Sequence, residues 1–523
     1  MIQSQTQTQS YWVSQFMLTE SDIEQIYNHF LEVERPQSAA ELAAVVMEYR
    51  IAQEKNEIKQ RLAGRVVYQP QEQYEVGDEL VFPALNFAYG TVNDVREGSN
   101  PEAGKFTVLA VEVDGKEREF AAGYPLDHVL NQEENTIFEA MDMISATDLH
   151  TLYGRAVAEK VAAELEEREG FVRLGHQWFL KGLLADITVG HLNLAEAVLE
   201  VSDGGPLPPQ EILPHLELEE EAPLETQAFS LNQAMQKDNR FDEVAPAGEV
   251  GWFLRRMEPA AVREVPERLL YEPVSFEERV LTPELKLLIR ELDDEWSDLE
   301  AGNTPQPVVL TLTYPHRWAG TLPLSARTRP LFPPSRSELQ RITFLDEHTD
   351  EEIVGWVVQQ YRYVYGLEDW YAENEIPIGG FISLRPGPEA GMLLLNYDRR
   401  RGQREWVRLA SVEENRIEFE LERRTIACGY DDLLIVGTDF VAAVDALWRR
   451  VTSNNRSIEW ILRQLFPELA ELNPQQTVHA KTLYSAFQML RRMPPGPIFA
   501  ELVQNADFVP VGDHYWQYKP SRG

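Results

Sequence analysis

The pattern of apolar and polar positions predicts three β-hairpins that share one composition. Each copy has an aromatic residue, a short apolar run, a Gly-containing turn and a Trp inside a second apolar run; the copies span 171–180, 241–254 and 508–518. Two apolar runs around such a turn are typical of a hairpin. Each copy also follows a segment with helical periodicity. A helix followed by a hairpin is the second half of a winged helix-turn-helix, so the repeat predicts several units of that kind.

Two amphipathic helices are predicted in the first of seven domains, residues 12–64. Ile23, Ile26 and Phe30 place an apolar stripe on a helix over 21–30. Ser38-Ala39-Ala40-Glu41 matches a capping box that opens a second helix over 42–50. Two short helices joined by a tight turn predict a helix-turn-helix pair.

In the second domain, residues 65–131, apolar and polar residues alternate as they do in β-strands. Alternating segments and an Asp114-Gly115 turn predict five short strands, and therefore a small barrel. The run from Val76 to Pro83, followed by Gly90-Thr91-Val92, resembles SH3-like barrels of transcription factors, including the polymerase-interacting domain of the CarD type. The third domain, 132–185, carries a helix and the first hairpin. The barrel is therefore either inserted in the first winged helix or separates two half-units.

The fourth domain, residues 186–270, contains three helical segments and a hairpin. The helices are predicted over 194–199, 206–213 and 229–235, and the hairpin begins at Phe241. This order resembles the HARE-type winged helix-turn-helix, a family that includes the delta subunit of bacterial RNA polymerase. The chain departs from the family by lacking Gly after Val244 and by inserting Pro246-Ala247-Gly248, which predicts a longer wing. The resemblance implies binding to nucleic acid or to polymerase.

The last three domains are an acidic helical linker (271–304), a β-rich domain (305–445) and a C-terminal winged helix (446–523). In the β-rich domain, Leu322-Pro323-Leu324 is followed by Gly-Trp-x-Val, Leu-x-x-Trp and Ile-x-x-Gly-Gly motifs. Over 310–396 this order resembles the DNA-binding pseudobarrel of plant auxin response factors and the effector domain of the restriction enzyme EcoRII. Gly380 stands where those domains carry Asp. We therefore predict an α+β multidomain protein with several winged helix-turn-helix units, a small SH3-like β-barrel and a DNA-binding-pseudobarrel-like β domain.

The amino-acid composition limits the kinds of protein that this chain can be. The chain has 523 residues, of which 43% are hydrophobic, which is typical of several packed domains. Its single cysteine, Cys428, excludes a disulfide within the chain and favours a reducing compartment. We see no signal peptide and no apolar stretch long enough for a membrane helix. We expect a cytoplasmic protein that does not contact membranes.

The charge is distributed unevenly. The net charge is −38, which opposes nucleic-acid binding on average. Residues 305–424, however, contain 15 Arg, no Lys and 18 acidic residues, so this segment carries −3 and the remainder −35. Arg binds guanine and phosphate bidentately, which Lys does not.

The Arg-only domain supplies the predicted nucleic-acid-binding residues. By resemblance, those beside the 322–324 strand lie where the family's first arm enters the major groove, and Arg362 lies near the second arm. A charged hairpin turn supplies the rest. The full set is His316, Arg317, Trp318, Arg327, Arg329, Arg362, Arg399, Arg400 and Arg401.

We find no motif of a zinc protease, a phosphate loop, a dinucleotide site or a hydrolase nucleophile elbow. We therefore expect no enzymatic activity, no metal and no cofactor. The predicted function is that of a DNA-binding or transcription-associated regulatory protein, with double-stranded DNA, RNA polymerase or both as partners. Two alternatives stay open: an acidic protein–protein scaffold without DNA contact, in which the acidic surface binds protein partners, and the specificity partner of a nuclease in a defence system.

Overall fold

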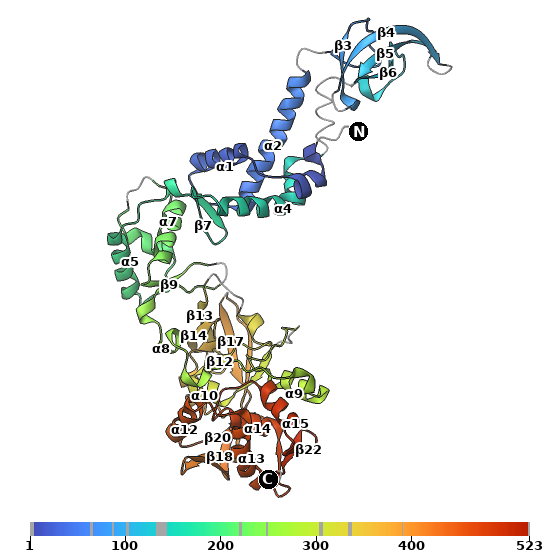
Figure 1. Cartoon of the computed structure of the whole chain (residues 1–523). Helices are drawn as coiled ribbons and strands as arrows, with labels where there is room; N and C mark the ends of the chain where they lie inside the picture. The colour runs from blue at the N-terminus through green and yellow to red at the C-terminus, as the bar shows by residue number, and fades with distance from the viewer. Residues whose placement is uncertain are drawn as a thin grey trace. The chain divides into compact units, whose positions relative to one another are not determined.

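The computed structural model is a mixed α+β multidomain protein with several β-sheets, one of them curled into a half-barrel (Figure 1). It divides into an N-terminal unit, Met1–Ile187 with Leu218–Gln233, and a C-terminal unit, Thr188–Glu217 with Ala234–Gly523. The described residues are 5–62, 66–85, 88–100, 104–113, 115–131, 144–218, 222–246, 249–302, 307–332, 337–389 and 391–520. Parts of three predicted features lie outside them: the Asp114-Gly115 turn, the inserted Pro246-Ala247-Gly248 and the start of the 132–185 domain.

Helices and a three-stranded sheet form one part of the N-terminal unit. The elements are α1 (Glu20–Val33), α2 (Ala39–Leu62), α4 (Ala146–Glu166), β1 (Gln37–Ser38), β7 (Phe171–Leu174) and β8 (Gln177–Leu180). The sheet order is β1-β8-β7, and Trp12, Phe30 and Phe179 are buried in the shared core. The predicted hairpin over 171–180 is confirmed, as are both predicted helices.

The capping box at Ser38 forms as its sequence predicts. The Ser38 N–H donates to Glu41 Oε2 at 2.7 Å, and the Glu41 N–H donates to Ser38 Oγ at 3.2 Å. This reciprocal pair satisfies two backbone donors at the start of α2. The helix then continues 12 residues beyond the predicted end at Arg50, because no Gly or Pro interrupts the Glu- and Lys-rich segment that follows.

Five strands make the half-barrel. They are β2 (Val66–Val67), β3 (Glu79–Phe82), β4 (Ala88–Asn100), β5 (Gly104–Val113) and β6 (Lys116–Ala122), hydrogen-bonded in that order. The sheet curls until the chain after β2 meets the end of β6. There the Tyr68 hydroxyl donates to the Ala121 carbonyl, and the Gly123 and Tyr124 N–H groups donate to the Glu72 and Pro70 carbonyls. Leu80, Leu109 and Val111 fill the concave side.

The C-terminal unit begins with short helices and the second hairpin. The elements are α5 (Val189–Val201), α6 (Pro209–Ile212), β9 (Phe241–Glu243) and β10 (Trp252–Leu254); α7 (Leu224–Lys237) runs across the boundary between the two units' ranges. The predicted hairpin over 241–254 is confirmed by the β9–β10 pairing. The predicted helix over 206–213 is only one turn long, because Pro214 has no N–H to continue it.

A seven-stranded curved sheet follows. Its strands are β11 (Val308–Thr311), β12 (Thr321–Pro323), β13 (Leu339–Asp346), β14 (Glu352–Val358), β15 (Tyr363–Tyr365), β16 (Phe381–Pro386) and β17 (Met392–Tyr397). Their order is β11-β16-β17-β13-β14-β15-β12, with β13 and β17 parallel and the other neighbours antiparallel. Helices α10 (Tyr314–Ala319) and α11 (Glu368–Glu373) accompany it. Leu322, Phe344 and Ile382 are buried in its core.

Strands β18 (Arg399–Glu413) and β19 (Arg416–Cys428) form a long antiparallel ribbon that joins two hydrophobic cores, and the short strand β20 (Val436–Gly437) pairs in parallel with β18 at Arg408 and Leu409. At one end Val407 and Ile426 pack into the core of the seven-stranded sheet. Near the turn, Ala410 and Phe419 pack into the core of the C-terminal helices. Val407 and Ala410 point to opposite faces of the strand, since successive side chains alternate. Where Val407 packs on the seven-stranded sheet, the opposite face of the ribbon therefore stays in solvent, and Arg404, Trp406 and Arg423 are exposed there.

The C-terminal helices form the largest core among the residues that the structure describes. They are α9 (Pro283–Leu292), α12 (Val441–Ser453), α13 (Ile458–Glu471), α14 (Ala480–Phe487) and α15 (Pro495–Gln504), with a sheet of β21 (Thr477–His479), β23 (Tyr515–Tyr518) and β22 (Phe508–Gly512). The third predicted hairpin, over 508–518, is confirmed. Leu285, Tyr314 and Phe466 share this core, although they come from three predicted domains, 271–304, 305–445 and 446–523. No helix in the described part of the chain is long and apolar enough to cross a membrane.

Candidate nucleic-acid interface

An acidic segment, Glu291–Glu295, begins in the last turn of α9, ends just beyond the helix and is the centre of a buried charge cluster. The side chain of Arg492, only 2% exposed, lies between two carboxylates: its Nη1 is 2.8 Å from Asp294 Oδ2 and its Nη2 is 2.5 Å from Glu295 Oε1. The Tyr484 hydroxyl also donates to Asp294, at 2.6 Å. Burial raises the pKa of Asp294 against the opposing charge of Arg492. Burial acts in the same direction on Glu295, but Arg492 and His316 outweigh it and hold the pKa of Glu295 well below its usual value.

Three of the predicted site residues contact this acidic segment. His316 is buried, with its Nδ1 2.8 Å from Thr321 Oγ1 and its Nε2 3.3 Å from Glu295 Oε1. Arg362 donates to the Glu295 carbonyl at 2.8 Å, and its guanidinium lies 4.8 Å from the centroid of the Trp296 ring. Arg327 donates to the carbonyls at the end of α9, those of Arg290 and Glu291. These side chains hold the acidic segment in place.

Arg317 and Trp318 are also engaged inside the protein. Arg317 Nε donates to the Ile376 carbonyl at 2.9 Å, and its guanidinium lies 5.0 Å from the centroid of the Trp318 ring. Burial lowers the pKa of Arg317, although a guanidinium stays charged at neutral pH. Arg329 is half-buried at the start of a short 3-10 helix, Arg329–Leu331.

The last three predicted residues, Arg399, Arg400 and Arg401, are exposed at the start of β18. Arg400 is paired with Asp398 at 2.6 Å. The structure therefore divides the predicted set in two: six residues beside the acidic segment and the strand β12, and three on the ribbon. Their role in binding nucleic acid stays a prediction.

The register of the ribbon reveals a basic surface that the sequence did not show. In an antiparallel pair, directly opposite residues point to the same face. The opposite pairs are Arg404 with Thr425, Trp406 with Arg423, and Arg408 with Leu421. We call these six residues the outer face. It combines three Arg, an aromatic ring and an aliphatic side chain, and it includes no Asp or Glu.

Carboxylates of the same stretch point to the other face of the ribbon. Glu405 lies opposite Arg424, and Glu422 lies opposite Val407. Arg424 is ion-paired with both Glu422 and Asp439. The strand alternation therefore divides the charges of this stretch of the ribbon between one basic face and one face of mixed charge.

The sequence alone does not reveal the outer face, and the reason is physical. The alternation in Glu405-Trp406-Val407-Arg408 shows which residues of this one strand share a face. Which residues of the second strand join them depends on the register. A shift of one residue would place Glu422 beside Trp406 instead of Arg423.

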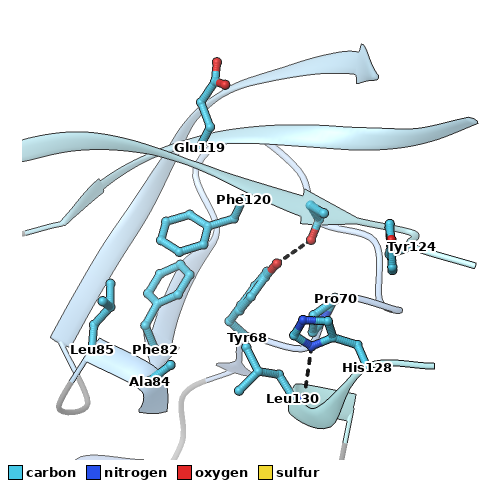
Figure 2. Close-up of a pocket in the computed structure, with 11 residues that line it drawn as sticks. Tyr68, Pro70, Phe82, Ala84, Leu85, Glu119, Phe120, Tyr124, His128 and Leu130 are labelled. Carbon is cyan, nitrogen blue, oxygen red and sulfur yellow. Dashed lines mark hydrogen bonds between the residues drawn. The ribbon is translucent and has the colours of Figure 1, made fainter. Parts of the chain in front are cut away.

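A separate apolar pocket opens in the half-barrel (Figure 2). Its volume is about 360 Å³, within the range of small-ligand sites. The Phe82 and Phe120 rings lie beside one another with centroids 4.2 Å apart, whereas the Glu119 side chain points away from them. At the rim the Leu130 N–H donates to His128 Nδ1, so a neutral His128 carries its proton on Nε2. The pocket is suited to an apolar group.

The described residues contain no cluster of three or more His, Cys, Asp or Glu side chains that could hold a metal ion. Comparison with protein-family models, with curated proteins and with solved structures finds no match to the chain.

Proposed function

We propose that the chain is a nucleic-acid-binding, transcription-associated protein that contacts its ligand through the outer face. The supporting observation is the segregation of charge on the ribbon: the exposed Arg404 and Arg423 and the half-buried Arg408 share one face, and no Asp or Glu of either strand lies on it, in a protein of net charge −38. The winged helix-turn-helix, SH3-like and pseudobarrel assignments belong to the same proposal, with the winged helices contacting DNA or RNA polymerase.

The local arrangement matters more than the net charge. Exposed charges interact with a phosphate over about 8 Å at physiological salt, because ions screen them beyond that distance. A nucleic acid on the outer face therefore interacts mainly with the Arg side chains there and not with the distant acidic residues. Arg404 and Arg423 are exposed and offer planar donor groups that match phosphate geometry. The acidic bulk repels nucleic acid elsewhere and thereby limits binding to this face.

Two adjacent residues of β19 provide the test. Arg423 lies on the outer face, whereas Arg424 is held by Glu422 and Asp439 on the other face. Binding of the intact chain to a labelled oligonucleotide, single-stranded and duplex, should be measured by anisotropy between about 50 mM and about 200 mM salt. Arg423→Ala should weaken binding and lower the salt dependence, whereas Arg424→Ala, with the same loss of charge, should leave both nearly unchanged.

The proposal fails if the intact chain shows no salt-dependent affinity for either form of nucleic acid. The acidic scaffold that binds protein partners would then be the better account, because its charge argument, −35 outside residues 305–424, does not depend on the ribbon.

A further inference from the structure

We infer that the outer face binds unpaired nucleotides, with the indole of Trp406 as a stacking platform, so that the ligand class is single-stranded nucleic acid. This inference rests on the proposed function and names its substrate. It depends on the exposure of one aromatic ring, on the cations around it, and on what a duplex offers to such a surface.

Trp406 is 60% exposed, more than any other Trp in the described chain. The Trp residues of the three predicted hairpins are buried by contrast: Trp178, Trp252 and Trp516 are between 2% and 5% exposed. Trp406 therefore contributes little to a core. A single exposed ring is ordinary on a protein surface, so the cations around Trp406 have to carry the argument.

Cations flank this ring on both strands. The guanidinium of Arg423 lies 5.7 Å from the centroid of the Trp406 ring, which is a cation–π contact across the ribbon. Arg404 and Arg408 lie two residues before and after Trp406 on the same strand, about 6.6 Å away along it. Arg408 is anchored because it donates to the Asp432 carbonyl at 2.7 Å. The result is a row of cation, ring and cation, in which Arg404 and Arg423 are exposed and Arg408 is half-buried.

Such a row matches an unpaired strand, whose phosphates and base faces are both accessible. Stacking of bases on aromatic side chains, with Arg following the backbone, is the general basis of single-strand binding. A duplex hides its base faces and presents only phosphates and base edges. The indole has a single N–H donor and no acceptor, so it reads base edges poorly. On a duplex, the outer face would use its Arg side chains alone.

The test compares four ligands for the intact protein: single-stranded DNA, RNA of the same sequence, the duplex, and an abasic strand of equal length. Trp406→Ala should weaken binding of the two base-containing single strands by roughly fivefold to 150-fold, which corresponds to about 1–3 kcal/mol of stacking. Binding of the duplex and of the abasic strand should change little. Trp406→Phe should retain most of the affinity because a ring remains.

The DNA and RNA arms show whether the sugar matters, since only RNA offers a 2′-hydroxyl. Thermal unfolding of Trp406→Ala should match that of the parent protein because the ring is largely exposed.

The outcomes separate the two proposals. If Trp406→Ala weakens all four ligands equally or none of them while Arg423→Ala still weakens binding, base stacking is wrong and the proposed function stands. If an acidic peptide competes as well as the single strand does, the outer face is a general anion site and the inference falls. If no nucleic acid binds the parent protein, both proposals fall.

Discussion

The guanidinium of Arg492 and the carboxylate of Asp294 form a buried ion pair, with Nη1 2.8 Å from Oδ2. Asp294 belongs to the segment after α9, and Arg492 follows α14, so the pair joins parts of the chain that are far apart in sequence. Glu295 contacts the same guanidinium and, through its carbonyl, Arg362 of the seven-stranded sheet. Because neither charge is solvated, each depends on its partners in the cluster.

Removing the central cation should therefore destabilise the C-terminal unit strongly. Arg492→Ala leaves Asp294 and Glu295 as neighbouring buried carboxylates, and we expect a loss of about 3–5 kcal/mol in the free energy of unfolding. Urea denaturation measures the loss. Arg279→Ala is the control, since that side chain is 83% exposed, and it should change the free energy by less than about 0.5 kcal/mol. A loss below about 1 kcal/mol for Arg492→Ala would show that the cluster rearranges or admits water.

The contacts of this cluster could not be predicted from the sequence. The hairpins were predictable because alternation around a turn is a local signal, and the capping box at Ser38 was too. His316, Arg327 and Arg362 looked available because they are polar and lie near Arg-rich stretches. Their partners are Glu295 and the end of α9, which packing brings together over as many as 67 residues of sequence. No local pattern contains that information.

Glu258 predicts a pH dependence of stability. It is 4% exposed, and burial, together with a hydrogen bond to Asp242 and the charge of Asp242, raises its pKa from 4.5 to about 8. Arg255 and Arg263 oppose this shift. Because the folded state holds the proton more tightly, the stabilisation is complete below about pH 4.5 and is lost as the pH rises through about 8.

Glu258→Gln keeps the shape of the side chain and removes its titration. The variant should lose less stability than the parent between about pH 6 and about pH 9, as measured by urea denaturation at each pH. Equal slopes for parent and variant would mean that Glu258 is charged in the folded state and that another group titrates.

Gly366 predicts a backbone effect in the seven-stranded sheet. Its φ is +126°, and a Cβ there would overlap the Val354 carbonyl oxygen. Gly512 has a similar φ of +106° but open space around it. Gly512→Ala should cost about 1–2 kcal/mol from the backbone conformation alone. Gly366→Ala should cost clearly more, because a fixed backbone atom must move as well. Thermal unfolding of both variants separates the overlap from the strain, and equal losses would contradict this reading.

Asp22 and Arg50 give a matching test in the N-terminal unit. Arg50 donates to both carboxylate oxygens of Asp22, at 2.7 and 2.6 Å, and the Asp22 side chain is fully buried. Asp22 also accepts from the Thr19 N–H at 2.7 Å, which caps α1. Asp22→Ala therefore removes the cap of α1 and leaves the Arg50 guanidinium without its carboxylate partner. We expect the free energy of unfolding to fall by about 3 kcal/mol. The loss is limited because Arg50 is 19% exposed and its guanidinium can be hydrated. A double-mutant cycle with Arg50→Ala isolates the ion pair. A coupling energy of about 1–3 kcal/mol would support it, whereas additive losses would assign the whole effect of Asp22 to the cap.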